Sequence, residues 1–179
     1  PTSFPSEMPT GEPSQSLAPT EYVTAYPTLG GNGSVADWET VTSMIESGVS
    51  RVSMAGVYSV VYKLLVRVGV DSTLYTPGES RVVVDGGSAV ARLALVKGVL
   101  RLNGPMTFEN MSHSEAGAIV VRDGGVLEAR DVIFRGLGSS QSGGALFFET
   151  GSEAYLFGVT FAECWSAGSG GGIAMLADR

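Results

Sequence analysis

The feature that most constrains this chain is a glycine-led apolar motif that returns about every 27 residues. The motif reads "GAIVVRDG" from Gly117, "GALFFETG" from Gly144 and "GGIAMLAD" from Gly171. A fixed period of this length is typical of solenoids, in which each repeat is one supersecondary unit that buries its apolar face against its neighbours. We therefore expect the chain to fold as a stack of similar coils.

The residues between these motifs predict strands, because apolar and polar residues alternate in short runs. Three such runs fit into each period, and the glycines that begin the motifs are expected at sharp turns, often with positive φ. This pattern predicts an all-β fold, a parallel β-helix with coils about 4.8 Å apart. Equivalent residues would then form ladders, of which two are Phe108, Phe134 and Phe161, and Ile119, Leu146 and Ile173.

Other repeat folds do not suit this spacing. Leucine-rich repeats of similar length carry a leucine and asparagine consensus that the chain lacks. Helical repeats need the periodicity of an α-helix, and the apolar runs are too short and too often broken by glycine. An antiparallel sandwich has no reason to repeat residue by residue.

Residues 1–28 have a different composition. Pro1, Pro5, Pro9 and Pro13 recur at a constant short spacing, and each is followed by Ser or Thr. Proline fixes φ and removes a hydrogen-bond donor, so this segment is expected to be extended and polyproline-like. Such tracts are typical of O-glycosylated stalks, and this one resembles the tracts of secreted wall and surface proteins of algae and diatoms. A flexible linker explains the composition equally well.

Residues 29–48 predict a short amphipathic helix. Trp38, Val41 and Ile45 share one face at helical spacing, and Gly48 is a suitable residue to end the helix. The first coil of a solenoid exposes an unpaired strand edge and an open apolar end. We therefore expect this helix to cap the β-helix of residues 49–179.

A family resemblance rests on "SGGALFF", which begins at Ser142, and on "VIFRG" and "VTFAE". These segments resemble the GGA[I/L/V] and Phe-x-x-Asn repeats of polymorphic outer-membrane proteins, which belong to the pectin-lyase-like β-helix superfamily. The resemblance covers about residues 85–179, and Gly143–Leu146 matches the glycine motif fully. It implies a right-handed parallel β-helix, for which we expect about five coils of about 27 residues.

Composition excludes several partners and cofactors. The net charge of −7 argues against nucleic acid, because phosphate binding needs clustered Lys and Arg. No apolar run reaches the roughly 20 residues needed to span a bilayer. With Cys164 the single cysteine and His113 the single histidine, no internal disulfide or cysteine-based metal site is possible. We expect no metal and no cofactor.

Enzymes that resemble this fold gather acidic residues, often with Arg, Lys or calcium, on one face. The outward candidates here are Asp85, Asp123, Glu128, Asp131, Arg122 and Arg130. A general acid and base would need to occupy neighbouring columns on adjacent coils. One period after Asp123, Glu128 and Asp131 stand Thr150, Tyr155 and Gly158, so the acids do not stack. We expect no catalytic residues.

These patterns favour an extracellular structural or adhesive protein, such as a subunit of a cell-surface filament or wall layer. Asn32 and Asn110 begin N-glycosylation triplets, which agree with secretion. Expected partners are other copies, other surface proteins and glycans, with outward Tyr155 and Trp165 as sugar contacts. Because the last motif supplies only one strand of a coil, we expect further coils or another subunit beyond it. The alternative is a carbohydrate-active β-helix enzyme, a polysaccharide lyase or hydrolase, or a carbohydrate-binding module.

Overall fold

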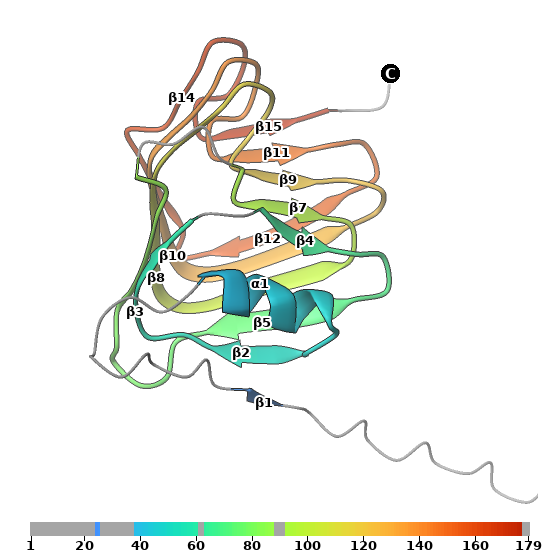
Figure 1. Cartoon of the computed structure of the whole chain (residues 1–179). Coiled ribbons are helices and arrows are strands. Elements are labelled where there is room, and N and C mark those ends of the chain that lie inside the picture. Colours follow the sequence, from blue (N-terminus) through green and yellow to red (C-terminus); the bar gives the residue numbers. More distant parts are fainter. Residues whose placement is uncertain (1–23, 26–37, 61–62, 88–91, 177–179) are drawn as a thin grey trace, which may run out of the picture.

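A computed structural model describes residues 24–25, 38–60, 63–87 and 92–176 of the chain. They form a parallel β-solenoid of about four turns with one short helix (Figure 1). The parallel β-helix expected from the sequence repeat is therefore confirmed. Figure 1 shows the coils stacked from β1 and α1 at one end to β15 at the other.

Two parallel sheets make up the solenoid wall. The first sheet follows the order β1-β2-β5-β8-β10-β12, with β3, β6, β13 and β14 continuing the same coils around a bend. Its strands are β1 (Thr24–Ala25), β2 (Arg51–Ser53), β3 (Gly56–Ser59), β5 (Asp71–Tyr75), β6 (Val82–Asp85), β8 (Val99–His113), β10 (Val126–Ser139), β12 (Glu153–Phe157), β13 (Thr160–Ala162) and β14 (Trp165–Ser166). The second sheet contains β4 (Leu64–Val66), β7 (Ala94–Val96), β9 (Ile119–Val121), β11 (Leu146–Phe148) and β15 (Ile173–Met175).

The register places residues one period apart side by side. Leu146 pairs with Ile119 on one side and with Ile173 on the other. In the phenylalanine column the step from Phe108 to Phe134 is slightly shorter than the next step, and the difference has a local cause. The register of β8 against β10 shifts between Arg130 and Val132, where a β-bulge absorbs the difference.

The number of turns is smaller than expected from the sequence, about four rather than five. Strands of the second sheet mark one passage per coil, and its five strands enclose four turns. The earliest coils also differ in length, since Arg51 pairs with Thr73 but Leu64 pairs with Ala94. The segment of β2 and β3 that precedes β4 is a partial coil, which a division of residues 49–179 by a constant period counts toward a full turn.

Helix α1 (Trp38–Glu46) lies within residues 29–48 and packs against β2 and β4. Trp38, Val41 and Ile45 are buried, as an amphipathic helix covering an apolar end requires. The backbone N–H groups of Gly48 and of the following residue donate to carbonyls of the last helical turn, which ends the helix. The rest of the tail, residues 1–23 and 26–37, lies outside the described residues.

The glycines that begin the motifs serve two different needs. Gly117 has a φ of 45°, in the left-handed region. For the other two motifs the positive φ falls one residue earlier, on Gly143 and Gly170. Gly144 is required by close packing instead, because a Cβ there would lie well under 3.0 Å from two backbone carbonyl oxygens of the next coil.

Candidate functional site

The outward side chains of β5, β12 and the first halves of β8 and β10 form one surface, here called the ladder face. Its central column runs Thr73, Arg101, Glu128 and Tyr155, and the next runs Tyr75, Asn103, Arg130 and Phe157. Alternation along each strand turns these side chains outward while their neighbours fill the core. The ladder face is therefore a regular array of charged, polar and aromatic groups.

Ion pairs connect three coils of the ladder face. The Arg101 guanidinium binds Asp71 on the preceding coil through Nη1, and Glu128 on the following coil through Nε at 3.1 Å. About a third of the Arg101 side chain is exposed, so solvent screens both pairs. The main effect of this arrangement is to hold the three side chains in fixed positions.

Aromatic side chains gather at the end of the ladder face on β12. Tyr155 and Phe157 are 48% and 52% exposed. The Arg130 guanidinium lies 4.9 Å from the Phe157 ring centre, a cation–π distance. The Tyr155 hydroxyl donates to Glu153 Oε2 at 2.8 Å, and this bond raises the pKa of Tyr155. Beside the Phe157 ring lies a hollow of about 150 Å³, which Asn103, Glu128 and Arg130 also line.

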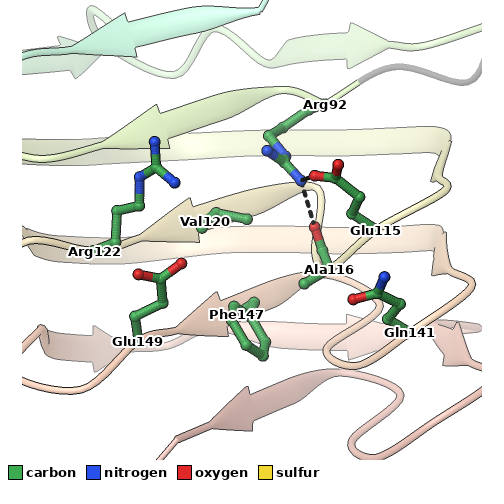
Figure 2. Close-up of a pocket in the computed structure, with 8 residues that line it drawn as sticks. All are labelled: Arg92, Glu115, Ala116, Val120, Arg122, Gln141, Phe147 and Glu149. Carbon is green, nitrogen blue, oxygen red and sulfur yellow. Dashed lines mark hydrogen bonds and ion pairs between the residues drawn. The ribbon is translucent and has the colours of Figure 1, made fainter.

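A second hollow, of about 230 Å³, lies on the outer side of the second sheet (Figure 2). Val120 and Phe147, from β9 and β11, form its apolar floor between two groups of charged side chains. The remaining lining residues are Arg92, Glu115, Ala116, Arg122, Gln141 and Glu149. This hollow is called the second-sheet groove below.

The second-sheet groove exists because the strands here are apolar on both sides. Every residue of β7 and β9 is buried, although Leu95 and Val120 point away from the core. They are only 6% and 3% exposed, and in the same outward column they are flanked by Leu65 and Phe147 of the neighbouring strands. The sequence signal was the run of consecutive apolar residues in each strand, whereas alternation alone predicts a polar outer residue.

One end of the second-sheet groove carries a network around Arg92. Its Nη2 donates to Glu115 Oε2 at 2.8 Å and to the Ala116 carbonyl at 3.3 Å, and it lies 3.3 Å from His113 Nδ1. The bond from Arg92 lowers the pKa of Glu115, and burial together with the Arg92 charge lowers the pKa of His113. The Nε atoms of Arg92 and Arg122 are buried without a hydrogen-bond partner among the described residues.

The acidic and basic candidates from the sequence lie in separate parts of the coil. Glu128 and Arg130 belong to the ladder face, whereas Arg122 lines the second-sheet groove. Asp123 follows β9 and pairs with Lys97 at 2.9 Å, which lowers the pKa of Asp123. The structure therefore places these residues around the solenoid and does not converge them on one groove.

The other two acidic candidates lie at bends. Asp85 ends β6 and accepts hydrogen bonds from the Gly87 backbone at 2.8 Å and from Asn110 Nδ2 at 3.1 Å. Asp131 sits at the bulge with a φ of 55°. Within the described ranges, no group of three or more His, Cys, Asp or Glu side chains is placed to hold a metal ion.

Of the two glycosylation triplets, the one at Asn110 is described. Its side chain is exposed, with a φ of 56° at a bend of the coil, and Asn32 lies outside the described residues. No helix in the described part of the chain combines the length and hydropathy of a membrane span. Comparisons with protein-family models, curated proteins and solved structures found no match for this chain.

Proposed function

We propose that this chain is an extracellular structural or adhesive protein that binds through its ladder face. The observation that carries the proposal is the ion-paired row Asp71–Arg101–Glu128, which fixes charged groups across three coils beside the exposed rings of Tyr155 and Phe157. Side chains already held in place lose less conformational entropy when a partner binds. A stiff solenoid with such a face suits adhesion.

The same geometry supports binding rather than turnover. A general acid and base must face the same substrate bond within a few ångströms. On the ladder face, Glu128 Oε1 is bound by Arg101 Nε, and the register neighbours of Glu128 are Arg101 and Tyr155. Neither residue that pairs with Glu128 on the adjacent coils is therefore a carboxylate, and Glu153 on β12 is engaged by the Tyr155 hydroxyl.

The finer classification is also a proposal. We assign the solenoid to the pectin-lyase-like superfamily because of the "SGGALFF" and phenylalanine repeats. The proline-rich residues 1–28 support secretion to a cell surface or wall. Further copies or other surface proteins are proposed partners at the β12–β15 end, where inward Leu156, Phe161 and Ile173 are only half-buried.

A carbohydrate-active enzyme or carbohydrate-binding module is the second candidate. Exposed Phe157, which lines the hollow on the ladder face, and exposed Tyr155 on the same strand favour it, because flat aromatic faces pack against sugar rings. The two candidates differ in whether a bound polysaccharide is cleaved.

The test incubates the purified chain with insoluble and soluble polysaccharides, neutral and acidic, and with immobilised surface proteins. Binding is measured by co-sedimentation and turnover by the release of reducing ends or unsaturated sugars. The proposal expects binding without product, weakened by Arg101→Gln and by Tyr155→Ala. Arg81→Gln is the matched control, because Arg81 is an exposed arginine without an ion pair to any described residue. Product release that Glu128→Gln abolishes would establish the enzyme instead.

A further inference from the structure

Trp165 lies outside both surfaces described above, on the short strand β14. It is 53% exposed, in contrast to Trp38, which is 1% exposed in the core. Its register partner on β10 is Gly138, and Gly138 in turn pairs with Ser112 on β8. Trp165 and Ser112 are therefore two coils apart, with a glycine between them.

The glycine determines where the indole lies. A Cβ on Gly138 would come well under 3.0 Å from Cε2, Cζ2 and Nε1 of Trp165. The ring system thus rests directly against the Gly138 backbone, which any larger residue would prevent. Since half of the residue is exposed, the ring has one supported side and one side open to solvent.

The open indole borders a hollow of about 180 Å³. Its lining residues are Asn110, Met111, Ser112, Gly136 and Trp165. Gly136 contributes no side chain, so the space between the coils of Asn110 and Trp165 stays empty. The hollow is smaller than the roughly 300 Å³ at the lower end of pockets for drug-sized ligands, and its size suits one sugar ring.

Polar groups with free hydrogen-bonding capacity face this hollow. Asn110 Nδ2 donates to Asp85 Oδ1 at 3.1 Å, which orients the amide so that Oδ1 lies 3.5 Å from the Cβ position of Gly136. Neither Asn110 Oδ1 nor the Ser112 hydroxyl has a hydrogen-bond partner among the described residues. No charged side chain lines the hollow.

We propose that Trp165, Asn110 and Ser112 form a subsite for one neutral pyranose ring of a glycan. The apolar C–H face of the ring packs on the indole, while its hydroxyls donate to Asn110 Oδ1 and exchange a hydrogen bond with Ser112. A lining without a charged side chain favours a neutral sugar over a uronate or a phosphate. The inference rests on the proposed adhesive function and names the class of partner at a site apart from the ladder face.

The test uses protein produced in bacteria, because a glycan attached at Asn110 would fill the hollow. The probes are methyl glycosides of glucose, galactose and mannose, neutral oligosaccharides of each, and a uronate oligosaccharide for comparison. Binding is followed by tryptophan fluorescence and saturation-transfer NMR. We expect a neutral probe to perturb the exposed Trp165 and to bind more tightly than the uronate.

Three variants make the test specific. Trp165→Ala should weaken binding about tenfold or more, as truncation of one aromatic anchor does. Gly138→Ala should displace the indole and weaken binding similarly while both tryptophans remain. Val68→Ala, which shortens an exposed apolar side chain outside the subsite and the ladder face, should leave binding unchanged. Circular dichroism verifies that each variant is folded. If Gly138→Ala does not fold, the comparison of the wild type with Trp165→Ala is the test.

Two results would overturn the subsite. One is that no neutral glycoside or oligosaccharide binds the wild-type chain. The other is that binding survives Trp165→Ala but is lost with Tyr155→Ala. The second result would leave the proposed adhesive function standing and would move sugar recognition to the ladder face, so the two proposals fail separately.

Discussion

Phe134 stacks on Phe108 with ring centroids 5.6 Å apart and ring planes inclined by 19°. Phe161 continues the stack on the other side of Phe134 at 5.4 Å and 16°. Phe108 and Phe134 are fully buried, whereas Phe161 on the last coil is half-buried. The phenylalanines of this column therefore lie in two different environments, one fully buried and one partly exposed to water.

This difference predicts unequal costs of truncation. Phe134→Ala should lower the free energy of unfolding by about 3–5 kcal/mol, because it leaves a cavity between two rings. Phe161→Ala should cost clearly less, since part of its ring already contacts water. Denaturant unfolding of both variants measures the difference, with Phe134→Leu as the milder control. Equal losses would show that the last coil is as well covered as the coil of Phe134.

A second prediction concerns the bend formed by Asn110, Gly136 and Glu163. All three residues have φ between 55° and 58°, the left-handed region that glycine adopts most easily. Glu163→Gly should therefore raise the free energy of unfolding by about 0.5–1 kcal/mol, the relief of strain exceeding the entropy lost by glycine.

The reverse change at the same bend should destabilise the protein. Gly136→Ala should cost about 1 kcal/mol although the nearest atom lies 3.5 Å from the new Cβ, because the φ angle rather than space is limiting. Thermal melts compare both variants with Glu163→Ala, which keeps the strain and should change little. Stabilisation by Gly136→Ala would contradict the backbone conformation at this bend.

Arg101 provides a third prediction. Arg101→Gln removes both ion pairs of the ladder face and should cost about 0.5–1 kcal/mol at low salt, the range of partly exposed pairs. At high salt, near about 1 M, the Debye length falls to about 3 Å, so the cost should shrink. Arg81→Gln should show neither effect. A loss that does not depend on salt would mean that Arg101 acts through packing of its stem.

Protonation of His113 gives a fourth prediction. Its Nδ1 accepts the Glu115 backbone N–H at 3.0 Å and faces the Arg92 guanidinium, and Lys63 adds a further positive charge nearby. Burial and these cations lower the folded-state pKa below the value of 6.5 for a free histidine, and Glu115 only partly opposes them. As pH falls below about 6.5, the unfolded chain binds a proton that the native chain does not, so stability decreases.

The measurement is the free energy of unfolding between about pH 8 and pH 5 for the wild type and His113→Gln. The difference between the two proteins isolates the histidine from the carboxylates that titrate at lower pH. This difference in the free energy of unfolding should be constant above about pH 7. Below about pH 6.5 the wild type should lose stability relative to His113→Gln. A wild type that gains stability relative to the variant on acidification would contradict the network around Arg92.

The sequence was sufficient for the fold where the period is constant. From Ile119 to Leu146 and from Leu146 to Ile173 the register steps are equal, so equivalent positions of these repeats can be aligned directly in the sequence. The earlier coils vary, as the steps from Arg51 to Thr73 and from Leu64 to Ala94 show, and loops of changing length hide their repeat.

The candidate surfaces could be predicted only in part. Outward Tyr155 and Trp165 follow from alternation, but the support of the indole by Gly138 depends on a register between distant segments. The second-sheet groove was missed because Leu95 and Val120 are apolar outward residues, and alternation cannot show that they stay buried between the neighbouring strands. The spacing of residues in the sequence also does not show which Lys or Arg side chain pairs with each carboxylate.

The measurement that tests the central claim most directly is a set of interstrand NOEs for Leu146, because every ladder and site described here depends on its register. In a parallel solenoid, Leu146 should show backbone NOEs to residues around both Ile119 and Ile173, and its methyl groups should contact those of both residues. Both sets of contacts are expected in the pattern of parallel strands. An antiparallel pattern, or the absence of contacts to Ile119, would contradict it.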